Sequence, residues 1–139
     1  MCEYYICAYY INANFEYMIA IDFFEAKVEN TFSPMDYMYA IKQQPEQFIL
    51  VDVRNAPPHL KKVKITNAIQ IPLNELESRL AELPDDKTII VYCWDTWCNL
   101  GAKAAIMLLK HGYKVKELSG GIAAWQTMQF QVDEIACGC

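Results

Sequence analysis

The feature that most constrains the fold is the five-residue run TIIVY, Thr88–Tyr92, in which every side chain is β-branched or aromatic. A strand with one face in water alternates apolar and polar residues, whereas an unbroken apolar run of this length is typical of a strand buried on both faces. Such strands lie inside parallel sheets that helices cover on both sides. The run therefore predicts the central strand of an α/β domain.

Other segments with strand and helix character alternate around this run. Short apolar runs predict three more strands, at residues 48–53, 68–71 and 113–118. Helical spacing of apolar residues, or a helix-start signal such as Ser33-Pro34, predicts helices over residues 34–44, 74–83, 99–110 and 122–128. A capping box formed by Asp22 and Glu25 predicts a further short helix over residues 23–30. Alternation of this kind indicates an α/β fold with a mainly parallel sheet.

The length of 139 residues fits a single domain with additions at its ends. Residues 1–17 form an aromatic-rich extension, whose pattern leaves open an extra strand, a helix or a dispensable segment. Residues 18–130 form the predicted domain. Residues 131–139 form a tail that ends in Cys137-Gly-Cys139.

The charge balance excludes some partners. A formal net charge of −5 argues against nucleic acid, whose phosphates favour clustered Lys and Arg. The basic cluster of Lys61, Lys62 and Lys64 is interpreted as a solvated loop. No run approaches the roughly 20 apolar residues of a membrane span. The N-terminus lacks the basic region and cleavage site of a signal peptide. We therefore expect a cytoplasmic protein without membrane contact.

Cys93 is the candidate reactive residue among six cysteines. It directly follows the central strand, and a loop over residues 94–99 leads from it into a predicted helix. Backbone N–H groups and the helix dipole at such a junction favour a thiolate over a thiol. A thiolate in this position is suited to act as a nucleophile or as a sulfur carrier.

Five motifs in order carry a resemblance to a known family. They are Asp52-Val53-Arg54, AIQIPL at 68–73, IIVYC at 89–93, GYKV at 112–115, and LSGG at 118–121 followed by Trp125. Together they resemble the rhodanese-like domain family. The resemblance implies a five-stranded, mainly parallel sheet flanked by helices on both faces. It also implies a cysteine that accepts sulfane sulfur as a persulfide and passes it to a thiol acceptor, with neither a cofactor nor a metal.

The resemblance also assigns roles to individual residues. Cys93 matches the persulfide cysteine. Asp52 and Arg54 match positions that support the end of a strand. The loop whose backbone amides cup the transferred sulfur matches Trp94, Asp95, Thr96, Trp97, Cys98 and Asn99. The implied partners are a small sulfane-sulfur donor and a thiol acceptor, either a small molecule or a protein.

The loop departs from the family pattern because it contains no Arg or Lys to pair with thiosulfate. It carries Asp95 instead, and Lys103 lies farther along the next helix. Weak thiosulfate activity is therefore expected. Trp94 and Trp97 either anchor the loop to the core or form an apolar rim for a thiol partner.

Two features leave alternatives open. Cys98 either acts as a resolving thiol, closing a disulfide with Cys93 and releasing sulfide, or is a small buried residue. The disulfide requires the two Cα atoms to lie within about 7 Å. Cys137 and Cys139 belong to a flexible tail, relay sulfur from Cys93, or share a zinc site with Cys2 and Cys7, although Cys2 and Cys7 are spaced too widely for the usual zinc pattern.

The leading functional hypothesis is a sulfurtransferase that acts through Cys93. One alternative is a non-catalytic binding module of the same fold that presents Trp94 and Trp97 to a partner. A lesser alternative is a phosphatase or arsenate reductase of the same fold class, whose loop would normally end in an Arg that this loop lacks.

Overall fold

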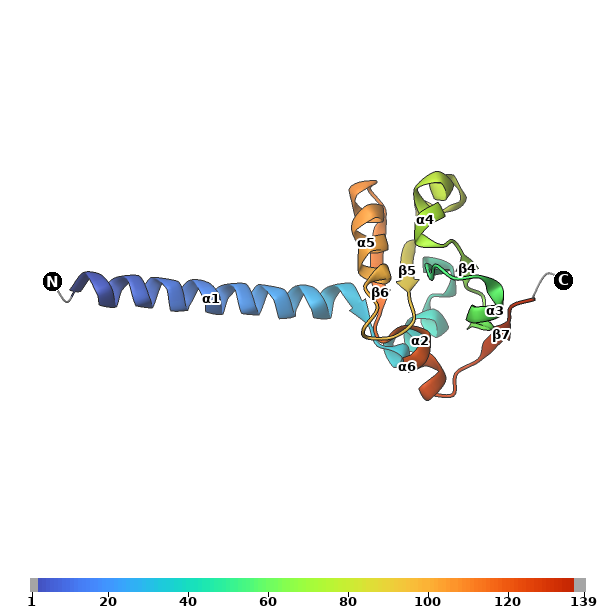
Figure 1. Cartoon of the computed structure of the whole chain (residues 1–139), viewed down its shortest axis with the longest axis horizontal. Coiled ribbons are helices and arrows are strands. Elements are labelled where there is room, and N and C mark those ends of the chain that lie inside the picture. Colours follow the sequence, from blue (N-terminus) through green and yellow to red (C-terminus); the bar gives the residue numbers. More distant parts are fainter. Residues whose placement is uncertain (1–2, 137–139) are drawn as a thin grey trace. The chain divides into compact units, whose positions relative to one another are not determined.

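The computed structural model describes the backbone of residues 3–136 and the side chains of residues 16–136. The chain divides into two compact units, Met1–Asn30 and Thr31–Cys139 (Figure 1). The division falls after Asn30, whereas the sequence suggested one after residue 17. None of the helices in the described part of the chain is long and apolar enough to cross a membrane.

The first unit is one continuous helix, α1, Glu3–Asn30. The prediction of a separate helix starting at Asp22 is wrong, because Asp22 and Glu25 lie inside α1. Residues 1–30 contain no glycine or proline to end the helix. Extending a helix costs much less than nucleating a new one, so the capping-box pattern is overridden.

The second unit contains the predicted central sheet. Its five strands are all parallel, in the order β1-β6-β5-β2-β4. The strands are β1 Thr31–Phe32, β2 Phe48–Asp52, β4 Ile69–Gln70, β5 Thr88–Tyr92 and β6 Lys114–Leu118. The TIIVY run is β5, and β2 and β6 flank it. The predictions of an α/β fold and of a buried central strand are confirmed.

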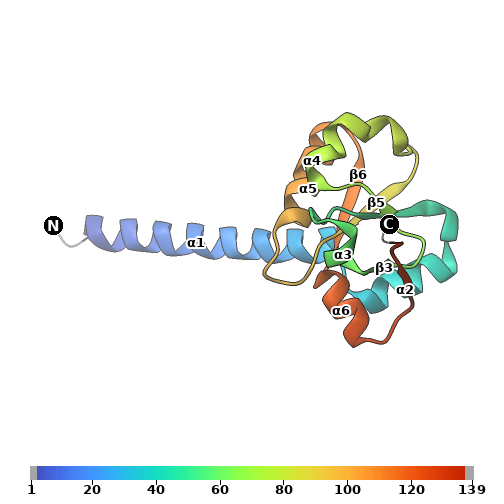
Figure 2. The same cartoon turned by 45° about the vertical axis from the view of Figure 1, so that its right-hand side comes forward.

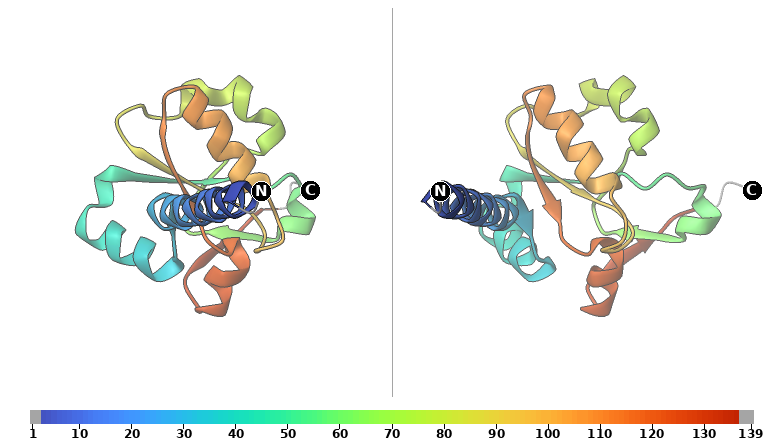
Figure 3. Two further views of the ribbon diagram at one scale, coloured as in Figure 1. Left: turned by 90° about the vertical axis from the view of Figure 1, so that its left-hand side faces the viewer. Right: turned by 60° about the vertical axis from the view of Figure 1, so that its left-hand side comes forward.

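Helices cover both faces of this sheet (Figure 2). On one face lie α4, Leu73–Leu76, and α5, Leu100–Lys110. On the other lie α2, Pro34–Gln43, and α6, Gly121–Thr127, as Figure 3 also shows.

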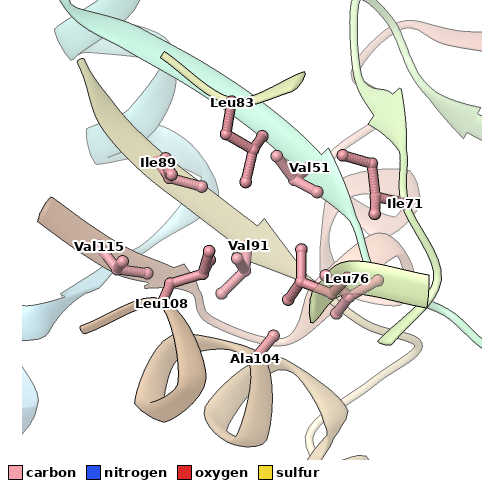
Figure 4. Packing of buried hydrophobic residues seen from close by; sticks show 10 residues of the cluster. Val51, Ile71, Leu76, Leu83, Ile89, Val91, Ala104, Leu108 and Val115 are labelled. Carbon is pink, nitrogen blue, oxygen red and sulfur yellow. The ribbon is translucent and has the colours of Figure 1, made fainter. Parts of the chain in front are cut away.

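The side chains of β5 alternate between two hydrophobic clusters. Ile89 and Val91 pack with Ala104 and Leu108 of α5 (Figure 4), whereas Ile90 and Tyr92 pack on the side of α2 and α6. Both faces of β5 are therefore buried, as its composition predicts. Cys93, which follows β5, therefore lies at the end of a strand that is packed on both faces.

Smaller elements complete the unit. They are β3 Val63–Ile65, which pairs antiparallel with β7 Val132–Glu134, the short helix α3 Pro58–Lys61, and 3₁₀ turns at Pro45–Gln47 and Glu77–Glu82. The helix predicted over residues 74–83 is one α-helical turn followed by a 3₁₀ helix. Leu76 and Leu83 are nevertheless buried as expected. Over two turns, apolar spacing does not distinguish 3.0 from 3.6 residues per turn.

The predicted start of α2 is confirmed in detail. The Ser33 Oγ accepts a hydrogen bond from the Asp36 amide at 3.1 Å, and the Asp36 carboxylate accepts one from the Ser33 amide at 3.3 Å. Pro34 occupies the first helical position. This reciprocal pair satisfies backbone donors at the helix start.

Candidate active site

Cys93 lies directly after β5 and is held from one side by the first turn of α6. The Cys93 carbonyl accepts a hydrogen bond from the Ile122 amide at 3.0 Å, and the Trp94 carbonyl accepts one from the Ala123 amide at 3.0 Å. First-turn amides have no partner within their own helix, so these bonds satisfy both groups at once. Cys93 is only 3% exposed. Its backbone is therefore fixed between the central strand and a helix start.

Gly121 makes this close approach possible. A Cβ atom at this position would overlap the carbonyl group of Cys93 and the carbonyl carbon of Trp94. Gly121 also has φ +57°, in the left-handed region that side chains disfavour. The second glycine of the LSGG motif is therefore required for the docking of the cysteine loop on α6.

We expect Gly121→Ala to displace this loop and to impair sulfur loading of Cys93. The added methyl group meets backbone atoms, which cannot move as a flexible side chain would. The left-handed φ adds about 1–2 kcal/mol. Gly112→Ala is the matched control, because Gly112 has φ +86° but open space around its Cβ position. Urea unfolding should show both alanine variants destabilised, while sulfur loading falls only for Gly121→Ala. Equal loading in the two variants would contradict the importance of this contact.

The structure joins Cys93 to Cys98 by a disulfide, with their Cα atoms 6.3 Å apart. Within the loop, the Asp95 carbonyl accepts a hydrogen bond from the Cys98 amide at 3.0 Å. The Asp95 carboxylate accepts one from the Thr96 amide at 2.6 Å. Two of the amides expected to face a transferred sulfur are thus bound by Asp95 in this disulfide form. The loop ends at Asn99, after which α5 begins.

Asp52 and Arg54 form a buried ion pair at the end of β2. The Arg54 guanidinium donates to both Asp52 carboxylate oxygens, at 2.9 and 2.6 Å, and to the Val63 carbonyl at 2.7 Å. The Tyr92 hydroxyl donates to the same carboxylate at 3.0 Å and accepts from the Ile65 amide at 3.1 Å. Burial, and then the charge of Asp52, raise the pKa of Tyr92. These contacts connect the end of β2 with β3 and with Tyr92, the residue that precedes Cys93.

The two tryptophans of the loop have different surroundings. The Arg54 guanidinium carbon lies 4.5 Å from the ring centroid of Trp94, within the range of a cation–π contact. Trp97 is 75% exposed. Trp94 therefore anchors the loop on the buried ion pair, whereas Trp97 presents an apolar surface beside it.

A cavity of about 230 Å³ adjoins the loop. Its polar and aromatic walls are Arg54, Lys61, Trp94, Asp95, Trp97 and Gln126. The side chains of Cys93 and Cys98 do not line it in the disulfide form. Trp94 and Asp95, which directly follow Cys93, line the cavity, so the cavity lies next to the candidate nucleophile.

Lys61 corrects a prediction. It ends α3 and is only 6% exposed, so its interpretation as part of a solvated loop is wrong. Burial lowers the pKa of its ammonium, and the nearby carboxylate of Asp52 opposes that shift. Lys62 is exposed as expected, and Lys64 forms a partly exposed ion pair with Asp133 at 3.6 Å. A short run of lysines does not reveal which of them a four-residue helix turns inward.

The remaining cysteines lie outside the described side chains. Cys2, Cys7, Cys137 and Cys139 therefore keep the alternatives stated above. Among the side chains that the structure does describe, no cluster of His, Cys, Asp and Glu could hold a metal ion.

Comparisons with known proteins agree with this arrangement. The family model described as "Rhodanese-like domain" matches residues 35–128. A crystal structure of a full-length protein from Lactobacillus plantarum superposes with a TM-score of 0.78 at 30% identity, covering 84% of this chain and 97% of that one.

Two curated relatives match in sequence. A protein named "Sulfurtransferase" from Allochromatium vinosum is 34% identical over 84 residues, 58% of this chain and 73% of that protein. The HTH-type transcriptional regulator Rv0324 from Mycobacterium tuberculosis is 36% identical over 95 residues, 67% of this chain. The match spans only 41% of that regulator's length. The family model covers well over half of the chain, and four of the five strands of the sheet, the loop and the buried ion pair lie within it. The chain belongs to the rhodanese-like domain family.

Proposed function

We propose that the chain is a rhodanese-type sulfurtransferase in which Cys93 carries sulfane sulfur as a persulfide to a thiol acceptor. The observation that carries the proposal is the position of Cys93, at the carboxyl end of the central strand and bonded to a second cysteine of the same loop. Ligands of open α/β sheets bind beyond this end of the strands. The similarity to the Allochromatium sulfurtransferase supports the same reaction class.

The loading step needs a free Cys93 thiolate, so the cycle begins with reduction of the disulfide by an external thiol. The thiolate then attacks the outer sulfur of a donor such as thiosulfate. A bond forms between Cys93 Sγ and that sulfur, the sulfur–sulfur bond of the donor breaks, and sulfite leaves with the bonding electrons. The 11-residue helix α5 begins soon after the loop, and its N-terminal dipole favours the thiolate.

Cys98 supplies a second step. Its thiolate attacks Cys93 Sγ in the protonated persulfide, and the outer sulfur leaves as hydrosulfide. The product is the Cys93–Cys98 disulfide that the structure contains. Two equivalents of an external thiol then reduce this disulfide, giving the free thiolate and an oxidised thiol. The disulfide therefore represents one state of the proposed cycle.

A single-turnover experiment with thiosulfate tests both steps, because sulfite reports loading and sulfide reports resolution. We expect the reduced wild-type chain to release both products. Cys98→Ser should release sulfite normally and sulfide at least about tenfold more slowly, since thiol–disulfide exchange depends on a positioned attacking thiolate. Cys93→Ser should release neither product.

The outcomes separate the competing hypotheses. Sulfide release from Cys98→Ser at the wild-type rate would remove Cys98 from the cycle. If the wild type releases no sulfite from thiosulfate and takes no sulfur from an inorganic polysulfide, the chain is better described as a binding module of the same fold. Hydrolysis of an aryl phosphate that depends on Cys93 would instead favour a phosphatase.

A further inference from the structure

Lys61 is a largely buried lysine that lies near the Asp52 carboxylate but does not bond to it directly. It is 6% exposed, and its ammonium makes no hydrogen bond or ion pair with any residue in the described part of the chain. Arg54 lines the same cavity, but its guanidinium is already bound to Asp52 and Val63. Although most of the side chain is buried, its nitrogen is not sealed from solvent, so the Lys61 ammonium is available to a ligand in the cavity. The cavity beside the loop is where an anionic group can reach it.

Asp95 provides a negative charge on the same cavity. Its carboxylate accepts a hydrogen bond from the Thr96 amide, and within the described residues it forms no ion pair with Lys61. One cation and one anion thus line the cavity without neutralising each other. A ligand complementary to both charges carries an anionic group and a cationic group itself.

The size of the cavity limits the ligand further. Pockets for drug-sized ligands usually have volumes of about 300–1,000 Å³. This cavity has about 230 Å³, and Trp94 and Trp97 supply apolar walls. The space suits a molecule of amino-acid size and not a nucleotide-sized thiol. Trp94 and Asp95 directly follow Cys93 in the chain, so a ligand held between them lies beside the candidate nucleophile.

From the cavity we infer that the sulfur acceptor is a small zwitterionic amino-acid thiol, with its carboxylate bound by Lys61 and its ammonium by Asp95. This inference rests on the proposed function, of which it specifies the acceptor. The acceptor thiolate attacks the outer sulfur of the Cys93 persulfide. The bond between that sulfur and Cys93 Sγ breaks, Cys93 leaves as a thiolate, and the acceptor carries away the sulfur and its proton as a new persulfide.

The test compares four thiols: L-cysteine, cysteamine without the carboxylate, 3-mercaptopropionate without the ammonium, and 2-mercaptoethanol without either charge. A full-length Cys98→Ser chain, which cannot resolve its own persulfide, is loaded with inorganic polysulfide. Loss of the added sulfur is then followed by mass spectrometry. Each rate is divided by the 2-mercaptoethanol rate of the same variant, and each thiol is compared only with itself across variants. Differences in thiol reactivity and in loop charge then cancel.

We expect Lys61→Gln to lower the relative rates of L-cysteine and 3-mercaptopropionate about tenfold, the range for one charge-assisted contact, while sparing cysteamine. Asp95→Asn keeps an oxygen that can accept the hydrogen bond from the Thr96 amide. This variant should lower the relative rates of L-cysteine and cysteamine and leave that of 3-mercaptopropionate unchanged. Lys62→Gln removes an equal charge from the exposed neighbouring residue and should change none of the ratios. Lys61→Arg should retain most of the preference for L-cysteine.

A second measurement keeps the native cavity, in case Lys61→Gln does not fold. L-serine, which has the shape and charges of cysteine but no thiol, should inhibit transfer to L-cysteine competitively, and ethanolamine should inhibit less. Unchanged ratios in both charge variants, or equal inhibition by serine and ethanolamine, would overturn the inference. Failure of the parent chain to take up any sulfur would instead overturn the proposed function, which makes the two failures distinguishable.

Discussion

Replacing Arg54 with methionine is expected to lower the free energy of unfolding by about 3–5 kcal/mol, the usual cost of leaving one charge of a buried ion pair without its partner. Arg54 and Asp52 are both fully buried, and the Asp52 carboxylate would lose two hydrogen bonds from the guanidinium. The Val63 carbonyl and the Trp94 ring would also lose contacts with this side chain. Urea unfolding followed by circular dichroism measures the change.

Arg79→Met is the matched control for the loss of an arginine. Arg79 pairs with Glu75 and Glu82 on a partly exposed surface, at 2.9 and 2.7 Å. Exposed pairs usually contribute less than about 1 kcal/mol, so this variant should remain close to the wild type. Adding Asp52→Asn to Arg54→Met should recover part of the loss, because it removes the orphaned charge. Equal destabilisation by Arg54→Met and Arg79→Met would show that the buried pair contributes little.

Sequence predicts best those parts of the fold whose structure is encoded by the residues of a single segment. The TIIVY run indicates burial on both faces, and β5 is buried on both faces. Ser33-Pro34 indicates a helix start, and α2 begins at Pro34. In both cases, local chemistry and tertiary packing favour the same structure, which makes the pattern reliable.

Other elements depend on partners elsewhere in the chain, and sequence does not reveal them. Strand β1 has two residues, too few for any period, and it forms only because β6 lies beside it. Strand β3 likewise depends on β7, about seventy residues away (Val63 pairs with Glu134). Propensity is a weak guide when pairing across the chain decides the outcome.

The candidate site shows the same division. Cys93 and its loop are identifiable from the sequence because they follow a recognisable strand. Lys61 is not, because its inward orientation arises from α3, a four-residue helix with no apolar periodicity. The sequence raised the Cys93–Cys98 pairing as an alternative conditional on a short Cα separation, and the structure places the two Cα atoms 6.3 Å apart. Sequence therefore does not predict the contacts between side chains that belong to separate elements.

Site-resolved mass spectrometry of the loaded protein tests the central claim, that Cys93 carries the sulfur. The chain is reduced, freed of reductant, exposed briefly to inorganic polysulfide, alkylated and digested. We expect the mass of one extra sulfur atom on the peptide that contains Cys93 in the Cys98→Ser chain, and complete loss of that species when Cys93→Ser is added. Cys93 directly follows the central strand, and its carbonyl is bonded to the start of α6, so we expect no other cysteine to replace it. The added sulfur on a different cysteine, or an equal mass gain after Cys93→Ser, would contradict the account.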